Sequence, residues 1–355
     1  MKSKYYELTD HHIDRYGEEL YQIKATRSFE LSDGTAIKAG QLGGYVGTAV
    51  VIGDCTWVQK GAFVTNGTKI GDNVKIGDNV KIGRWVEIGD NAIIGDNVKI
   101  GYNVTIRKKV KVNANTKIGD NAEIGDNAEI GAWVKIGDKV KIGGDVKIDY
   151  GAEIGKKVQI CENVIIGNNA DIGGDVKIGD YAELGDNVKI HRYAQIGKYA
   201  KISKNVKFVY RVIIGDKVII GDNVTICAWI IGDNVSIYND VKIGEGVIIG
   251  DDVSIYGDTV IGDNVTIGDN VSVYSAAEIG DNVKIGDGAV ICYNVTICEN
   301  VTICDNVFIY DDVEVGYWVK IGANAKINDK VTIDDGVNIG DNAIISNHEN
   351  PANLP

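Results

Sequence analysis

The residues best suited to chemistry lie in three short stretches at 191–193, 209–211 and 227–229, spaced 18 residues apart. They hold arginines, a histidine, aromatic rings and a thiol, and lysines precede two of the stretches. Positive groups beside aromatic faces suit an anion that carries a ring or a phosphate. We call this candidate ligand-binding cluster the basic corner; it consists of Lys189, His191, Arg192, Tyr193, Lys207, Tyr210, Arg211, Cys227 and Trp229. The alternative is a decorated corner that packs against a neighbouring subunit.

A six-residue phrase must position this cluster, because it recurs through most of the chain. Residues 70–106 read IGDNVK, IGDNVK, IGRWVE, IGDNAI, IGDNVK and IGYNVT, and we number the slots of each phrase one to six from the Ile. Slots five and one are apolar with a polar residue between them, as in a half-buried strand. The Asp and Asn of slots three and four favour a tight corner, since Asn tolerates the left-handed backbone region. Each phrase therefore predicts one short strand and one corner.

A fixed short period indicates a solenoid, in which stacked turns bury the apolar slots that one turn cannot bury alone. The phrase resembles the hexapeptide repeat of left-handed parallel β-helix proteins, in which three phrases form one triangular turn of 18 residues. The resemblance covers roughly residues 46–345. It implies an all-β fold of about 17 turns, and the left hand is implied by the resemblance alone. Residues 18 apart then become vertical neighbours.

The period divides the chain into three parts. Residues 1–45 lack it and are expected to form a small β-rich cap, since an open solenoid end exposes unpaired strand edges. This segment resembles the N-terminal module of bacterial and phage hexapeptide-repeat proteins, some of them labelled transferases, at 8–10, 20–25 and 38–45. Residues 46–345 form the predicted β-helix, with one residue missing between Ile226 and Ile231. Residues 346–355 are a C-terminal tail.

Charge and composition restrict the class of protein. From Ile231 onward the chain has 5 Lys against 21 Asp plus Glu, whereas the preceding residues carry 32 basic and 29 acidic groups. This asymmetry argues against nucleic acid binding along the second segment. No apolar run approaches the ~20 residues of a membrane span, and the N-terminus lacks a signal core. We therefore expect a cytoplasmic protein, whose six Cys remain free thiols.

Resemblance to hexapeptide acyltransferases, which take acyl-CoA as substrate, implies that His191 could act as a general base. Those enzymes usually interrupt the solenoid with a long loop that shapes the acceptor pocket. No insertion occurs between Val46 and Ile345, so we expect a uniform wall without a concave site. The γ-class carbonic anhydrases share the fold but need three His on zinc, whereas His191 is the one His within the repeats. We expect no metal.

Two vertical columns stand out beside the basic corner. The first is an aromatic column that we expect to be an interface between copies of the chain, made of Tyr238, Tyr256, Tyr274, Phe308 and Tyr310. Stacked like residues also stabilise parallel turns, and that is the alternative. A homo-oligomer could equally form through the C-terminal turn. The second column, Lys81, Lys99, Lys117 and Lys135, is expected to be a solvated face.

The sequence favours a structural or binding β-solenoid rod that acts through the aromatic column or the basic corner. This interpretation includes no catalysis and no cofactor. The alternative is a hexapeptide acyltransferase that uses acyl-CoA as its donor, with His191 as general base.

Overall fold

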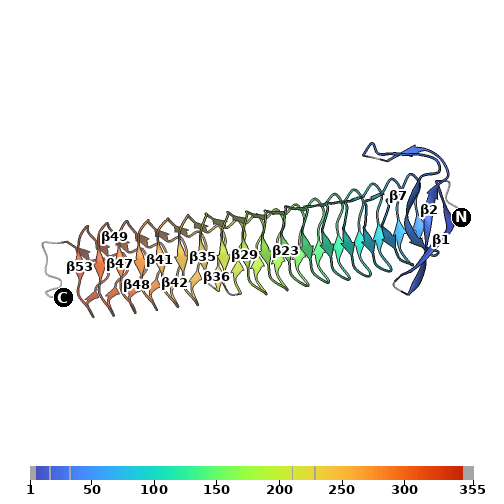
Figure 1. The fold of residues 1–355 in the computed structure, drawn as a ribbon. Coiled ribbons are helices and arrows are strands. Elements are labelled where there is room, and N and C mark those ends of the chain that lie inside the picture. The colour runs from blue at the N-terminus through green and yellow to red at the C-terminus, as the bar shows by residue number, and fades with distance from the viewer. Residues whose placement is uncertain (1–4, 16, 32, 210, 228, 347–355) are drawn as a thin grey trace. The chain divides into compact units, whose positions relative to one another are not determined.

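The computed structural model describes residues 5–15, 17–31, 33–209, 211–227 and 229–346. The chain divides into two compact units, residues 1–181 and 182–355, and each is considered by itself. The described residues form strands and corners (Figure 1). This described part contains no helix long and apolar enough to cross a membrane. Tyr210, one member of the basic corner, lies outside the described residues.

The first unit begins with antiparallel strands. β1 (Tyr6–Arg15) pairs with β2 (Glu18–Ala25), and β2 pairs with β5 (Leu42–Gly47). The short strands β3 (Phe29–Glu30) and β4 (Ala36–Ile37) form a separate hairpin. β5 then pairs in parallel with β8 (Phe63–Val64), the next strand of the β-helix on that side. The antiparallel strands thereby supply hydrogen-bonding partners to the first turn of the solenoid.

The β-helix of the first unit is built from two-residue strands. They run from β6 (Val51–Ile52) to β27 (Lys177–Ile178), and one strand begins at every sixth residue. Each strand pairs in parallel with the third strand along the chain, so that three sheets form around a common core. For example, β11 (Lys81–Ile82) pairs with β14 (Lys99–Ile100) with Lys81 opposite Lys99. Residues 18 apart are therefore vertical neighbours, as predicted.

The second unit repeats this construction around one irregular corner. Strands begin at every sixth residue from β28 (Glu183–Leu184) to β35 (Thr225–Ile226). β36 (Ile230–Ile231) begins one residue early, and the period resumes from β37 (Ser236–Ile237) to β55 (Ile344–Ile345). Ile213 still pairs with Ile230, so the missing residue shortens a corner without shifting any strand by one place. A one-residue slip would have turned every buried side chain outward.

The apolar slots fill the core of both units. Slot five holds mostly Val or Ala, with a few buried Thr such as Thr116, and slot one holds mostly Ile; Val98 is 0 % exposed and Ile100 is 4 % exposed. Between turns, the slot-six and slot-two amides donate to carbonyl oxygens of the following turn, as Lys81 N does to Val98 O at 2.9 Å and Gly83 N to Ile100 O at 3.0 Å. Each buried aliphatic side chain contributes about 1.5–3 kcal/mol before entropy is subtracted.

The corners follow the predicted chemistry. Slot four adopts the left-handed region, with φ of 56° at Asn73 and 59° at Asn91, where Asn is tolerated better than other L-residues. A slot-three Asp accepts a hydrogen bond from the backbone amide of the residue one turn earlier. For example, Asp54 N donates to Asp72 Oδ1 at 2.7 Å. The predicted parallel β-helix of about 17 turns, each of 18 residues, is confirmed within the two units.

Candidate functional site

The basic corner lies in the second unit, where three turns carry it one above another. Lys189 on β29 (Lys189–Ile190) pairs with Lys207 on β32 (Lys207–Phe208), and Lys207 pairs with Thr225 on β35. The corner residues follow these strands directly. The strands keep the predicted spacing of 18 residues as far as β35, and the described members lie around one corner of the solenoid. Trp229 departs from the prediction: β36 pairs with β33 at a spacing of 17, so Trp229 aligns with Val212 and not with Arg211.

Most of the basic corner faces solvent. His191, Arg192, Tyr193, Lys207 and Arg211 are exposed, and so are Lys189 and Trp229. Within the described residues, no salt bridge joins a carboxylate to any of its two lysines and two arginines. Four cations of this corner thus have no described salt-bridge partner, in a unit whose remaining corners are mostly acidic, which favours an anionic ligand.

The thiol of the basic corner is not activated. Cys227 is half-buried, and burial, together with the nearby carboxylates of Asp263 and Glu245, raises the pKa of its thiol despite the opposing effect of Lys207. A raised pKa lowers the fraction of thiolate, which is the nucleophilic form. His191 therefore remains the candidate for proton transfer at this corner, and Cys227 is not a candidate nucleophile.

The aromatic column is ordered as a stack along its first three members. The rings of Tyr238 and Tyr256 lie 4.6 Å apart at 6°, and those of Tyr256 and Tyr274 lie 4.9 Å apart at 4°. Burial, and then the neighbouring tyrosines, raises the pKa of the central Tyr256. Beyond Tyr274 the contact passes to Tyr293, at 5.3 Å and 44°. This residue is in slot three, and the sequence reasoning did not include it.

The aromatic column is less regular at its C-terminal end than at its N-terminal end. Cys292 occupies the same slot as Tyr274 in the next turn, as predicted, and its backbone amide donates a hydrogen bond to the Ile309 carbonyl oxygen at 2.9 Å. Phe308 and Tyr310 contact one another, with ring centroids 4.5 Å apart at 43°. The five predicted interface residues are therefore two groups, a parallel stack of three rings and a tilted pair.

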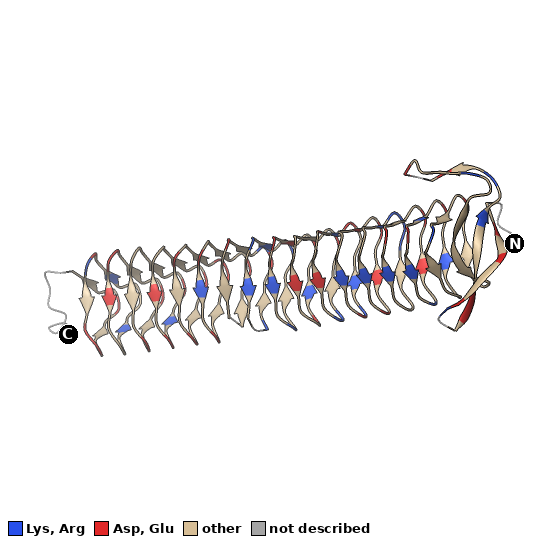
Figure 2. Ribbon diagram, viewed as in Figure 1, with Lys and Arg blue, Asp and Glu red and all other residues tan. Residues whose placement is uncertain are grey.

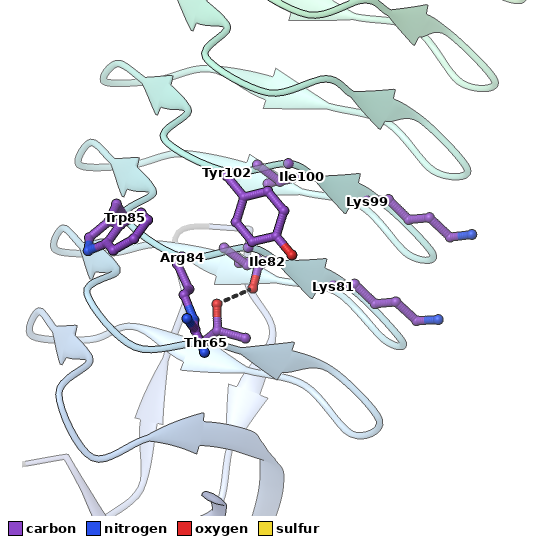
Figure 3. Close-up of a pocket in the computed structure, with 10 residues that line it drawn as sticks. Thr65, Lys81, Ile82, Arg84, Trp85, Lys99, Ile100 and Tyr102 are labelled. Carbon is purple, nitrogen blue, oxygen red and sulfur yellow. Dashed lines mark hydrogen bonds between the residues drawn. The ribbon is translucent and has the colours of Figure 1, made fainter. Parts of the chain in front are cut away.

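A cleft in the first unit was missed, and the expectation of a wall without a concave site was wrong. It encloses about 430 Å³ beside β11 and β14 (Figure 3). Its side-chain lining comprises Thr65, Lys81, Ile82, Arg84, Trp85, Lys99, Ile100 and Tyr102. No inserted loop forms it, because large side chains that replace the small corner residues create the walls. The substitution of Arg-Trp for Asp-Asn at 84–85, and of Tyr at 102, was the signal available in the sequence.

Thr65 and Arg84 link the cleft to the neighbouring backbone and to the N-terminal strands. The Arg84 guanidinium donates through Nε to the carboxylate of Glu18, whose side chain is only 7 % exposed. The same carboxylate accepts the amide of Asn66 at 2.8 Å. Thr65 Oγ1 donates to the Ile82 carbonyl oxygen at 3.1 Å. These contacts hold one side of the cleft in place.

The described residues offer no assembled metal site, since no three His, Cys, Asp or Glu side chains among them lie close enough to share an ion. All six Cys are free thiols in the structure. Tyr5, Tyr21 and Tyr317 also have raised pKa values because of local hydrogen bonds or charges, but each lies outside the three clusters described above.

Comparison with known families identifies the repeat. A model described as bacterial transferase hexapeptide matches residues 73–108, 103–138, 157–192 and 258–293. A second model, the hexapeptide repeat of succinyl-transferase, matches residues 276–311 and 314–347. The chain therefore belongs to the hexapeptide-repeat transferase family. No curated protein sequence matches it.

Several solved structures that resemble parts of the chain are acyltransferases. The UDP-N-acetylglucosamine acyltransferase from Campylobacter jejuni is 21 % identical with a TM-score of 0.35, over 46 % of this chain and 64 % of that one. The Arabidopsis UDP-N-acetylglucosamine acyltransferase is 18 % identical with a TM-score of 0.15, over 72 % and 69 %. The perosamine N-acetyltransferase from Caulobacter crescentus, solved with CoA and GDP-perosamine, is 16 % identical with a TM-score of 0.13, over 53 % and 52 %.

The match spans less than two thirds of the Campylobacter enzyme. The chain is a hexapeptide-repeat β-helix similar to acyltransferases.

Proposed function

We propose that the chain transfers an acyl group from acyl-CoA and that the basic corner holds the phosphates of the donor. The observation that carries this proposal is the set of four cations around His191 that have no salt-bridge partner among the described residues; His191 is the one histidine within the repeats. Membership in a family of transferases supports it. Lysine and arginine bind phosphate groups directly, and the exposed rings of Tyr193 and Trp229 offer faces for a base.

His191 would act as the general base. Its imidazole takes the proton from a hydroxyl or amino group of the acceptor as that oxygen or nitrogen attacks the thioester carbonyl. The carbon–sulfur bond then breaks, and the departing CoA sulfur receives the proton from the imidazolium. The acyl group is transferred, CoA is released as a thiol, and the histidine returns to its starting form.

Acetyl-CoA turnover by the full chain tests this proposal, with amino and hydroxyl acceptors supplied in parallel and free CoA quantified by mass spectrometry. We expect His191→Ala to abolish turnover while donor binding remains. Arg192→Gln combined with Arg211→Gln should weaken CoA binding by at least tenfold. Lys284→Gln removes a lysine elsewhere in the second unit and serves as the matched control. An absence of both CoA binding and turnover in the parent chain would contradict the proposal.

The parallel stack of three tyrosines favours a second candidate function, a binding rod that self-associates. Tyr238 is 45 % exposed, and aligned aromatic side chains are typical of interfaces. Tyr256→Ser combined with Tyr274→Ser should then lower the sedimentation coefficient of the chain. Tyr150→Ser removes a tyrosine that is 53 % exposed in the first unit and is the control. Sedimentation that is the same in all variants would leave the stack as a stabilising feature only.

A further inference from the structure

The cleft of the first unit belongs to neither candidate site described above. Ile82 and Ile100 are buried members of its lining, and Trp85 and Tyr102 stand at its corner with exposed fractions of 61 % and 51 %. Figure 3 shows the aromatic rings on the corner and the two lysine side chains extending from the adjacent strands. Ile82 and Ile100 belong to the core, so the aromatic faces supply the exposed apolar surface of the cleft, and such faces suit a flat ring.

The lysines of this cleft lack the carboxylate partners that several other lysines of the first unit have. Lys69 pairs with Glu87 at 3.0 Å, and Lys111 pairs with Glu129 at 3.1 Å, each between vertical neighbours. Lys81 instead lies opposite Lys99 in the parallel register, and no salt bridge joins either lysine to a carboxylate in the described part of the chain. Two like charges on adjacent strands repel unless an anion compensates them.

Trp85 occupies a backbone conformation that costs free energy. Its φ is 58°, in the left-handed region where bulky L-residues are strained and where most corners of this chain use Asn. The preceding turn makes room for the indole, since a Cβ on residue 67 would lie only 2.6 Å from Trp85 Cδ1, and residue 67 is Gly. Trp133 has a φ of the same kind, 63°, so the strain alone does not mark a site; at Trp85 it coincides with an open cleft.

Arg84 contributes shape more than charge. Its guanidinium is paired with the nearly buried carboxylate of Glu18, so the two charges largely offset each other. Lys81 and Lys99 consequently supply the net positive charge of the cleft. Glu18, the first residue of β2, holds the arginine in place, so the N-terminal strands help to shape the cleft.

We propose that this cleft binds a phosphomonoester that carries a flat aromatic ring, with the ring against Trp85 and Tyr102 and the phosphate between the Lys81 and Lys99 ammonium groups. The cleft offers one feature for each half of such a ligand, aromatic faces for the ring and two lysines for the phosphate. The other pockets found among the described residues do not combine these two features. The site is separate from the basic corner and does not depend on acyl transfer.

Isothermal titration calorimetry of the full chain with AMP tests the proposal, and adenosine and inorganic phosphate supply the two halves of the probe separately. We expect AMP to bind at least tenfold more tightly than either half. Adenosine or phosphate binding as tightly as AMP would overturn the two-part site. No measurable heat with AMP at millimolar concentration would overturn the proposal altogether.

Matched variants locate the binding. Trp85→Asn, and Lys81→Gln combined with Lys99→Gln, should each weaken AMP binding by at least tenfold. Trp133→Asn replaces an equally exposed tryptophan with the same positive φ, and Lys111→Gln combined with Lys141→Gln replaces lysines that have carboxylate partners. These controls should leave AMP binding unchanged within twofold. Equal losses in test and control variants would contradict the assignment.

The Trp85→Asn variant also carries its own folding control. Asn is the residue that most corners use at this slot, so the variant should melt at the same temperature as the parent chain or higher. A variant that keeps its thermal stability and still binds AMP as the parent does would sink the proposal.

Discussion

The two units share one backbone plan and differ in the charges on its corners. In the second unit, six aspartates occupy one vertical column, and each accepts a hydrogen bond of 2.7–3.0 Å from a backbone amide of the preceding turn. They are Asp216, Asp233, Asp251, Asp269, Asp287 and Asp305. In the first unit, cations interrupt such columns, as where Lys156 pairs with Asp138 at 2.8 Å. Lysine-bearing strands are also concentrated in the first unit (Figure 2).

This difference shows which part of the repeat determines the fold. The inner slots are the same in both units, and Val98 and Val253 are both fully buried. The outer slots accept Lys, Glu, Ser, Ile or Tyr with no change in strand position. The outward-facing slots can therefore vary without disturbing the fold, and each unit presents a differently charged surface. The following predictions test whether the inner slots are equivalent and the outer slots are not.

The largest effect should come from the core, and it should be equal in the two units. Ile100→Ala and Ile255→Ala each remove a buried side chain, 4 % and 0 % exposed respectively, and should each cost about 2–5 kcal/mol of local stability. Urea unfolding followed by hydrogen exchange in the surrounding turns measures this. The exposed Lys177→Ala should change stability by about 0.5 kcal/mol or less. A loss confined to one unit would break the equivalence of the cores.

Corner charges should give effects of opposite sign. Asp251→Asn keeps the oxygen that accepts the Asp233 amide but removes a charge from the aspartate column, so it should stabilise by up to about 1 kcal/mol at low salt. Asp138→Asn removes the partner of Lys156 and should destabilise by about 0–1 kcal/mol. Hydrogen exchange of the adjacent turns at low ionic strength measures both. The same sign in both variants would contradict the comparison.

Acid should release the β3–β4 hairpin before it affects the solenoid core. The hydrogen bond from Lys75, 2.6 Å away, holds the pKa of Asp33 at about 2, below its ordinary value of 3.8. A lowered folded-state pKa means that this contact stabilises above about pH 4 and is lost as the pH falls toward 2. Amide protection at 29–37 should decrease over that range. Asp33→Asn should remove the pH dependence, and protection that is constant to pH 2 would contradict the contact.

The smallest effect concerns thiol reactivity and leaves stability unchanged. Burial, and then the carboxylates of Asp311 and Asp329, raises the pKa of Cys292 to about 11, whereas Cys161 is exposed. At pH 8 iodoacetamide should therefore label Cys161 well before Cys292, as peptide mass spectrometry would show. Cys292 should become reactive as the pH approaches 11. Simultaneous labelling at pH 8 would show that the slot-two position is more open than the structure has it.

Most of the fold could be predicted from the sequence because each level of the repeat agrees with the next. Alternating apolar slots specify the strands, Asn at slot four specifies the corners, and the missing residue between Ile226 and Ile231 was located from the period alone. The vertical stack of Tyr238, Tyr256 and Tyr274 followed from the same register. The antiparallel strands of residues 6–47 have no period, and their pairing depends on tertiary contacts that a pattern does not reveal.

The candidate sites were less predictable, for a physical reason. A register predicts which residues are neighbours, but it does not predict whether their side chains leave space between them. The cleft depends on how Trp85 lies over Gly67 and on the pairing of Arg84 with Glu18, 66 residues away. Tyr293 joined the aromatic column from a neighbouring slot because its ring is long enough to reach Tyr274. Both outcomes depend on side-chain conformation, which the period does not specify.

The difference between the units can be measured directly by hydrogen exchange of the full chain at low and high sodium chloride concentrations. Salt screens the repulsion within the aspartate column of the second unit, so amide protection at 231–346 should increase with salt. Protection at 51–178, where cations interrupt the acidic columns, should remain constant or decrease. Protection that changes equally in both regions would contradict the claim that one backbone carries two electrostatically distinct surfaces.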